Sequence, residues 1–319
     1  MISTSPFALE QPKPLDPGKF RDPQVTASGE PRASVDLKAL ETLWFNTGTL
    51  CNLECKGCYI ESSPTNDALV YLTQIEVRRY IDEIADDALP VREIGFTGGE
   101  PFMNSEMVPI LTECLSRGFE VLMLTNAMRP MRRFEKQLLA LDHRDKLTMR
   151  VSLDHYSKAI HEAERGEDTW DKAIDGLVWL AHHNFPLAIA GRRLSSESDA
   201  AARAGYAQLF ASLSLPIAAD DPAQLVLFPE MDAEAETPEI TTSCWGILDV
   251  DPNTLMCASS RMVVKRKGEK NPRVAACTLL PYDPQFDLGK TLKEASQGVA
   301  LNHPHCARFC VLGGASCST

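Results

Sequence analysis

Three cysteines stand close together in the first quarter of the chain. Cys51, Cys55 and Cys58 form a C-x3-C-x2-C loop, and Tyr59 follows the third cysteine. Cysteines at such short spacings hold iron–sulfur clusters, whereas structural zinc usually takes four ligands from two distant pairs. No fourth cysteine or histidine lies near the loop in the sequence. Three thiolates on a four-iron cluster leave one iron open, so the loop predicts a reactive cluster, with half of a zinc site as the alternative.

Apolar segments alternate with helix-like segments through most of the chain. Strands are expected at residues 43–46, 93–97, 120–125, 147–153, 186–190 and 224–228. Strand and helix repeated six times predict a parallel sheet with right-handed crossovers. Six units are too few to close an eight-unit barrel. We therefore predict an α/β fold with a partial (β/α)6 TIM-like barrel, and a doubly wound sheet remains the alternative.

The helices between these strands have recognisable starts and faces. A capping-box pattern at Thr73–Glu76 opens the first helix. Its predicted core face consists of Ile75, Tyr80, Ile81 and Ile84. Further helices are expected at about 106–116, near 132–141 and at 198–213. Residues expected to pack in the core are Cys114, Trp44, Trp170 and Trp179.

Polar residues and glycines follow most of the predicted strands. In either fold the working loops lie at the carboxyl ends of the strands. The cysteine loop follows the first strand. The candidate residues after the later strands are Gly98, Gly99, Glu100, Pro101, Thr125, Asn126, Ser152, Asp154 and Arg192. Ser152 and Asp154 could simply cap the next helix, and Arg192 could be a solvated surface residue.

Composition divides the chain into three parts. Residues 1–38 are rich in proline and predict an extended arm. Residues 39–232 hold the β/α units. Residues 233–319 begin with an acidic linker and contain the remaining cysteine group. We expect this last part to be a small module held together by metal rather than by a large core.

Six cysteines lie in the C-terminal part of the chain: Cys244, Cys257, Cys277, Cys306, Cys310 and Cys317. Six thiols are enough for one fully ligated cluster but two short of the eight that two clusters need. Cys244 and Cys257 bracket a predicted hairpin with its turn at Asp251–Thr254. His303 and His305 could add a ligand, or they could be surface residues or neighbours that support the ligands. A zinc-stapled module is the alternative.

The overall charge and the termini restrict the class of protein. The 319-residue chain has a formal net charge of -12, which argues against broad nucleic-acid binding. It contains no apolar run of transmembrane length and no secretory signal pattern, so we expect a cytoplasmic protein without a membrane partner. In a reducing compartment, ten cysteines are more often metal ligands or catalytic groups than disulfides.

The motifs together resemble the radical S-adenosylmethionine (radical SAM) superfamily. The cysteine loop with its following aromatic residue and Gly98–Pro101 one unit later are similar to its first two motifs. Thr125–Asn126 and Val151–Asp154 resemble third- and fourth-strand motifs of its subgroup with auxiliary clusters, and Arg165–Gly166 also fits that subgroup. Ala127 and His155 replace the usual glycines of these motifs. The resemblance covers about residues 42–230.

The resemblance implies a [4Fe–4S] cluster on Cys51, Cys55 and Cys58, with S-adenosylmethionine (SAM) on the fourth iron. One electron would cleave SAM to methionine and a 5′-deoxyadenosyl radical, which removes a hydrogen atom from the substrate. Glu100 would contact the ammonium group of SAM and Arg192 its carboxylate. The residues implied in cofactor binding are Tyr59, Gly98, Gly99, Glu100, Pro101, Thr125, Asn126, Ser152, Asp154 and Arg192.

The C-terminal cysteines resemble those of SPASM/twitch extensions, which implies one auxiliary [4Fe–4S] cluster. Such a cluster suits a net oxidation of a peptide or small-molecule substrate, with flavodoxin or ferredoxin as the electron donor. Two alternatives stay open. One is a sulfur- or methyl-group transferring radical enzyme with a covalent C-terminal cysteine. The other is a non-catalytic Fe–S or zinc scaffold.

Overall fold

The computed structural model describes residues 5–8, 12–229 and 232–314. Six parallel strands follow one another in the core, each paired with the next. They are β2 (Thr42–Asn46), β3 (Glu93–Thr97), β4 (Glu120–Thr125), β5 (Leu147–Ser152), β6 (Leu187–Arg192) and β7 (Leu225–Phe228). All six lie within or next to the segments that the sequence predicts. The expected parallel α/β architecture is therefore confirmed.

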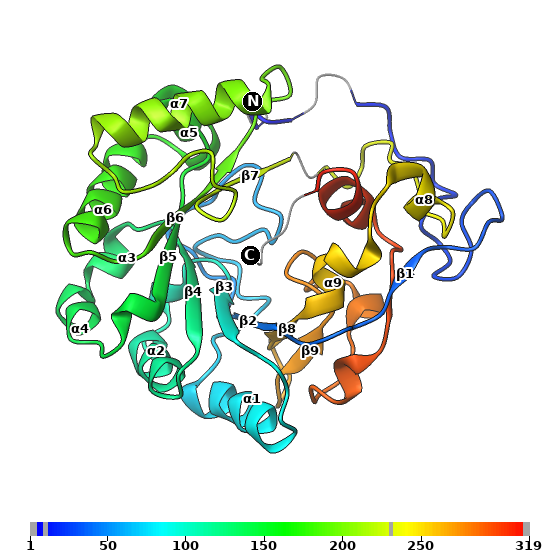
Figure 1. Cartoon of the computed structure of the whole chain (residues 1–319), viewed down its shortest axis with the longest axis horizontal. Helices are drawn as coiled ribbons and strands as arrows, with labels where there is room; N and C mark the ends of the chain where they lie inside the picture. Colours follow the sequence, from blue (N-terminus) through cyan, green and yellow to red (C-terminus); the bar gives the residue numbers. More distant parts are fainter. Residues whose placement is uncertain (1–4, 9–11, 230–231, 315–319) are drawn as a thin grey trace.

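Helices cover the outer face of this curved sheet (Figure 1). They are α1 (Gln74–Asp86), α2 (Met107–Ser116), α3 (Arg129–Arg132), α4 (Glu135–Leu139), α5 (Lys158–Arg165), α6 (Trp170–His182) and α7 (Asp199–Ser212). The single helix expected near 132–141 is two short helices, because the chain leaves the helical path at Phe134, which has φ -104 and ψ 12.

Helix α1 begins as predicted, with the reciprocal capping box between Thr73 and Glu76. Its buried face contains Tyr80, Ile81 and Ile84, but Ile75 is 76% exposed. The prediction for Ile75 was wrong because the buried face starts at Val77, and two residues turn a helix by about 200°. Cys114 and Trp44 are fully buried, as expected, and Trp170 and Trp179 pack against the core as partly buried side chains.

The C-terminal part extends the same sheet. Strand β8 (Ser260–Val264) pairs in parallel with β2, and β9 (Arg273–Ala275) pairs antiparallel with β8. The sheet order is β7-β6-β5-β4-β3-β2-β8-β9. Buried residues such as Val263 and Val274 belong to the same apolar cluster as the barrel core. The C-terminal part therefore shares the apolar core of the barrel, whereas the sequence predicted a small module held together by metal rather than by a large core.

The hairpin predicted between Cys244 and Cys257 was wrong. That segment contains α8 (Cys244–Leu248), a 3-10 turn at Pro252–Thr254, and α9 (Met256–Ser259). The Asp251 carboxylate accepts the Asn253 amide at 2.9 Å and caps the turn. The hairpin of the module is β8–β9 instead, and it is flanked by Cys257 and Cys277.

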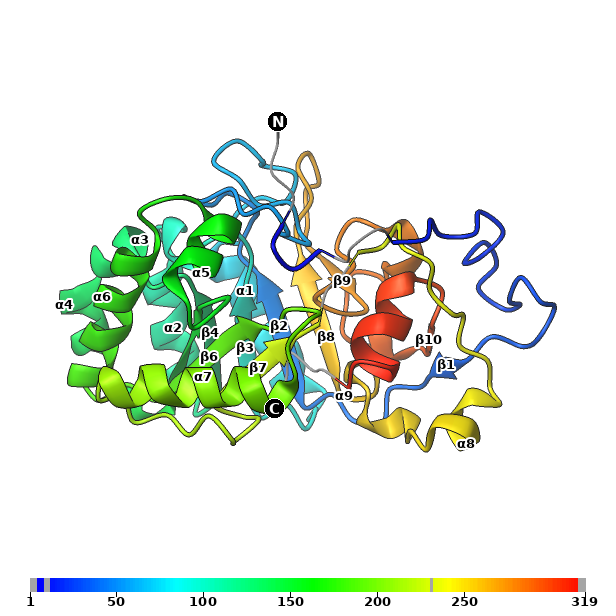
Figure 2. The same cartoon turned by 90° about the horizontal axis from the view of Figure 1, so that it is seen from above.

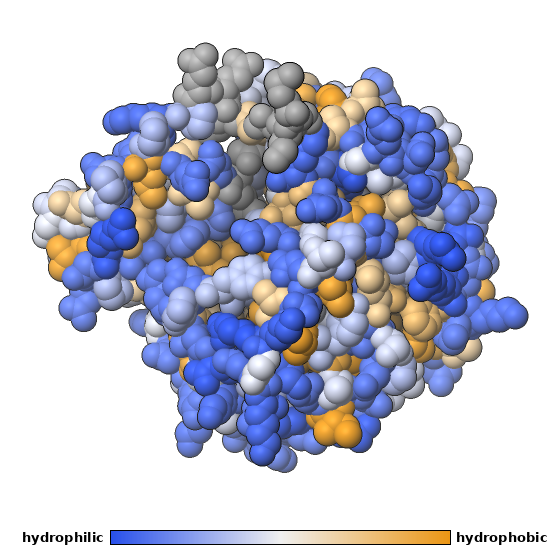
Figure 3. Space-filling view, turned by 180° about the vertical axis from the view of Figure 1, so that it is seen from behind, coloured by the Kyte–Doolittle hydropathy of each residue, from blue (hydrophilic) through white to orange (hydrophobic). Residues whose placement is uncertain are grey.

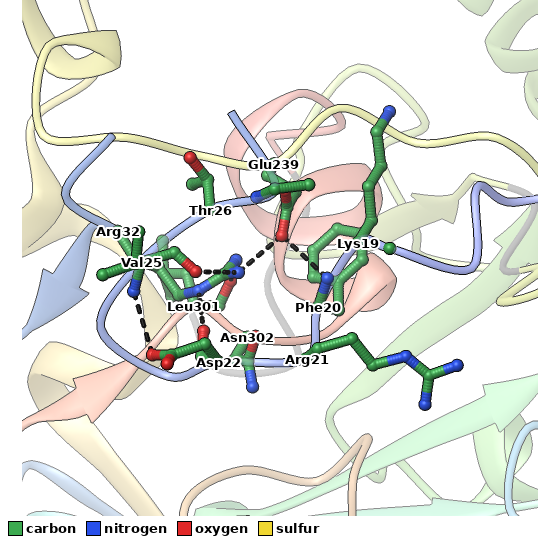
Figure 4. Close-up of polar contacts among 12 residues, drawn as sticks. Lys19, Phe20, Arg21, Asp22, Val25, Thr26, Arg32, Glu239, Leu301 and Asn302 are labelled. Carbon is green, nitrogen blue, oxygen red and sulfur yellow. Dashed lines mark hydrogen bonds and ion pairs between the residues drawn. The ribbon is translucent and has the colours of Figure 1, made fainter. Parts of the chain in front are cut away.

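The proline-rich N-terminal arm lies along the C-terminal module (Figure 2). Strand β1 (Ser34–Val35) pairs antiparallel with β10 (Val299–Ala300). The buried Arg32 guanidinium forms an ion pair with Glu239 at 2.5 Å and donates to the carbonyl oxygen of Asp22 at 2.7 Å (Figure 4). These contacts join the arm to both ends of the module.

Hydrophilic residues cover most of the face seen in Figure 3, where apolar residues form scattered patches. Within the part of the chain that the structure describes, no helix combines the length and the apolar character needed to cross a bilayer.

The Arg32–Glu239 pair predicts a large effect of a single substitution. Replacing Arg32 with Ala leaves a buried carboxylate without its cation, so we expect the free energy of unfolding to fall by about 3 kcal/mol. Urea denaturation measures this loss. The matched control is Arg92→Ala, because Arg92 and Glu41 form an exposed pair worth at most about 1 kcal/mol. Equal losses in the two variants would contradict the assigned role of Arg32.

Candidate active site at the carboxyl ends of the strands

One cavity lies where the strands end, between the core and the C-terminal module. It brings together side chains from the cysteine loop, from the ends of β3 to β7 and from helix α5. The predicted site residues that line it are Cys51, Cys55, Cys58, Tyr59, Gly98, Gly99, Thr125, Asn126, Ser152, Asp154 and Arg192. Residues far apart in the sequence thus share one cavity because parallel strands present their carboxyl ends at one edge.

Glu100 and Pro101 lie behind the cavity lining. The Glu100 carboxylate accepts hydrogen bonds from the Thr125 hydroxyl at 2.9 Å and from the Asn126 backbone N–H at 2.8 Å, and Glu100 is 1% exposed. Burial raises the pKa of Glu100 to about 7, although these donors oppose the shift. Pro101 is buried at the start of a short 3-10 turn. In this structure Glu100 therefore ties two strand ends together.

The two glycines bring the chain against the cysteine loop. Gly98 has φ +142, and a Cβ on it would lie 2.5 Å from the carbonyl oxygen of Gly48. A Cβ on Gly99 would collide with the Leu50 carbonyl group. In the native chain the Gly99 amide donates to Gly48 at 2.8 Å instead. These glycines hold the segment that leads into the loop at close range.

The cysteine loop presents its three thiols to the cavity. Burial raises the pKa of Cys51 to about 12 and that of Cys55 to about 11. Among the described residues, no three His, Cys, Asp or Glu side chains are gathered closely enough for a single metal ion. A four-iron cluster spreads three thiolates over three irons. Three thiols without a histidine in the lining fit such a cluster better than zinc.

Four charged side chains form a paired network at the side of the cavity. Arg165 donates to the Asp154 carboxylate at 2.5 Å and 3.2 Å, and Arg192 lies 3.2 Å from Glu164. Burial disfavours the charged form of Asp154, yet Arg165 and Arg192 outweigh it and lower the pKa of that carboxyl. Sequence reasoning missed Glu164, which lies between Ala163 and Arg165 at the end of α5 and matches no motif.

The far wall of the cavity is apolar. It consists of Phe228 and Pro229 after β7, with Leu279 and Phe309 from the C-terminal module. The rings of Phe228 and Phe309 lie 5.4 Å apart. Sequence analysis did not single out these residues, since only the packing of the module on β7 brings them together.

Three C-terminal cysteines are buried near one another. Burial raises the pKa of Cys306, and the charges of Cys257 and Cys277 raise it further. Cys310 follows one turn later on the π-helix Cys306–Val311. Cys244 is half-buried, and its sulfur accepts the Thr241 amide at 3.4 Å. Cys317 lies outside the described residues.

The two histidines of this region adjoin the cysteines. The rings of His303 and His305 lie 4.6 Å apart, directly before Cys306. Burial lowers the pKa of His305 to about 4, with a further contribution from His303. Both rings are thus within the module, and neither is an exposed surface side chain.

Comparison with known proteins places this site in a family. The profile of the radical SAM superfamily matches residues 45–192, which run from β2 and the cysteine loop to the end of β6. Residues 45–192 therefore belong to the radical SAM superfamily.

Curated relatives share this part of the chain. The antilisterial bacteriocin subtilosin biosynthesis protein AlbA of Bacillus subtilis (strain 168) is 30% identical over 167 residues, covering 52% of this chain and 35% of AlbA. The GTP 3',8-cyclase of Rhodococcus opacus (strain B4) is 32% identical over 162 residues, covering 50% of this chain and 39% of the cyclase. This chain therefore spans a little over a third of each of these two relatives.

Solved structures share the fold. Streptococcus suis SuiB bound to S-adenosylmethionine superposes with a TM-score of 0.58 at 11% identity, covering 79% of this chain and 63% of SuiB. SuiB bound to its precursor peptide SuiA gives a TM-score of 0.57 at 11% identity, covering 80% of this chain and 63% of SuiB. The partial barrel of this chain is thus a fold that it shares with SuiB.

The glycine turn yields a direct prediction. Replacing Gly99 with Ala forces the turn away from Leu50, so we expect the free energy of unfolding to fall by about 1–3 kcal/mol. Urea denaturation measures the effect. The control is Gly246→Ala, because a Cβ at Gly246 meets nothing within 4 Å. If both alanine variants were as stable as the parent chain, the close contact would not constrain the loop.

Proposed function

We propose that this chain is a radical SAM enzyme that removes a hydrogen atom from a peptide substrate, leading to a net oxidation. The observation that carries the proposal is the single cavity that joins the three loop thiols, the polar strand ends and an apolar wall. When bound there, a [4Fe–4S] cluster with SAM would supply the 5′-deoxyadenosyl radical. The protein would bind and orient the cofactor and the substrate, and it would keep water out of the cavity.

The residues of the cavity divide into two roles. Cys51, Cys55 and Cys58 would hold the cluster. Tyr59, Gly98, Thr125, Asn126, Ser152 and Asp154 border the same space and would contact SAM. Their hydroxyl, amide and carboxylate groups suit a ribose and an amino-acid moiety. Glu100, with Pro101, would support these contacts indirectly, because its carboxylate orients Thr125 and Asn126.

We further propose an auxiliary [4Fe–4S] cluster on Cys257, Cys277, Cys306 and Cys310. The first two flank the β8–β9 hairpin, and the last two lie one turn apart on a π-helix. The burial of the first three suits a cluster shielded from water. Cys244 begins the separate short helix α8, which belongs neither to the hairpin nor to the π-helix, so it is left out of the proposed set.

A peptide side chain suits the cavity better than a nucleoside triphosphate does. Arg165 and Arg192 are both paired with carboxylates of the lining, and the opposite wall consists of apolar residues. An uncharged side chain can pack on this wall, whereas a triphosphate needs cations that are free to bind it. AlbA, named for bacteriocin biosynthesis, and SuiB, bound to a precursor peptide, are consistent with this choice.

Anaerobic reconstitution with iron and sulfide tests the two proposed clusters. We expect about eight irons per chain, and about four in either Cys55→Ser or Cys257→Ser, because each variant loses one four-iron cluster. Cys244→Ser is the matched control and should keep all of them. Retention of iron in Cys257→Ser, with loss in Cys244→Ser, would overturn the assigned ligand set.

The formation of 5′-deoxyadenosine tests the radical reaction. With dithionite and SAM, the parent chain and Cys257→Ser should release 5′-deoxyadenosine, because the cavity cluster is intact in both. Cys55→Ser should release none above background. If the fully reconstituted parent chain released none, the proposed enzyme activity would have to be abandoned.

A further inference from the structure

The middle of the cysteine loop is bonded to the end of helix α5. Gly57 lies between Cys55 and Cys58, and its amide donates to Glu164 Oε1 at 2.7 Å. The neighbouring amide of Lys56 donates to the backbone carbonyl oxygen of Glu164 at 3.1 Å. Two consecutive loop amides therefore depend on one residue of the helix.

Arg192, at the end of β6, holds the same glycine through its carbonyl group. Its Nη2 donates to the carbonyl oxygen of Gly57 at 2.5 Å, and its Nη1 donates to Glu164 Oε1 at 3.2 Å. A Cβ on Gly57 would lie 2.5 Å from Arg192 Nη1. The absence of a side chain at Gly57 is thus what lets the guanidinium reach the loop backbone.

Glu164 is buried, Arg192 is half-buried, and both have other partners. The Glu164 side chain is 0% exposed, and its second oxygen accepts the Ser5 hydroxyl at 2.7 Å. The Arg192 guanidinium lies 5.3 Å from the ring centre of Phe7, which is buried. Hydrogen bonds to charged groups are stronger than neutral ones in such surroundings. The loop is therefore attached through a charge-assisted network.

We propose that Glu164 and Arg192 are positioning residues that tether the cysteine loop to α5 and β6, so that its thiols face the cavity. Arg192 then serves the loop backbone rather than the methionyl carboxylate of SAM, which is the role that the family resemblance implies for it. Two of its terminal nitrogens are already bonded within the protein. This inference goes beyond the proposed function, because the tether exists without SAM.

Amide hydrogen exchange in the full chain tests the tether. The chain is reconstituted anaerobically with iron and sulfide, SAM is left out, and exchange is followed by mass spectrometry in peptides that cover residues 51–61. In Glu164→Ala and Arg192→Ala we expect exchange of the loop to accelerate at least about tenfold, because each loses a hydrogen bond to a charged group. Glu164→Gln keeps an acceptor and should give a smaller increase.

Two neighbours serve as matched controls. Glu167 is exposed just after the end of α5. The exposed Arg193 donates to the backbone carbonyl oxygen of Glu197. Glu167→Ala and Arg193→Ala should exchange like the parent chain. Peptides from helix α2 should be unchanged in every variant, which separates a local effect from general unfolding. If an alanine variant does not fold, Glu164→Gln and Arg192→Lys decide the question.

The double variant and SAM affinity complete the test. Substitutions of two residues that act as one unit do not have additive effects on free energy. The double variant Glu164→Ala/Arg192→Ala should therefore accelerate exchange by less than the product of the two single accelerations. Unchanged loop exchange in Glu164→Ala would overturn the tether. If Arg192→Ala left loop exchange unchanged but weakened SAM binding, Arg192 would be a SAM-binding residue and the proposed tether through it would be wrong. If no cluster forms, the same comparison in the metal-free full chain still decides.

Discussion

The site depends on a contact between two stretches of backbone with no side chains between them. The turn at Gly98 and Gly99 lies against the carbonyl groups of Gly48 and Leu50, at a distance that excludes a Cβ. Because β2 and β3 are neighbours in a parallel sheet, their carboxyl ends meet at the same edge. The close contact of the glycine turn with Gly48 and Leu50 therefore fixes the position at which the cysteine loop leaves the sheet.

The second constraint is charge. Asp154, Glu164, Arg165 and Arg192 are all brought close to the cavity, where unpaired charges would be costly. The pairing of each carboxylate with a guanidinium makes the network neutral. Because these charges neutralise one another, the opposite wall needs no charged partner and is apolar. Phe309 of the C-terminal module completes that wall. The core and the module therefore build one cavity between them.

The sequence predicted the features that depend on local pattern. Hydrophobic periodicity, turn residues and motif spacing located the six core strands and the residues that follow them. Parallel topology alone then brings the ends of these strands together. Features that depend on contacts between distant segments were not predicted. The pairing of β8 with β2 is one example, since nothing in Ser260–Val264 specifies its neighbour. Glu164 is another, because its role appears only when α5 meets the loop.

The central claim is that the Cys51, Cys55 and Cys58 loop holds a cluster with one iron open to SAM. The most direct measurement is the electron paramagnetic resonance spectrum of the dithionite-reduced, reconstituted Cys257→Ser chain, recorded with and without SAM. The account predicts the signal of a reduced [4Fe–4S] cluster whose g-values shift when SAM is added, and loss of that signal when Cys55 is also replaced by Ser. A cluster signal that SAM leaves unchanged would contradict it.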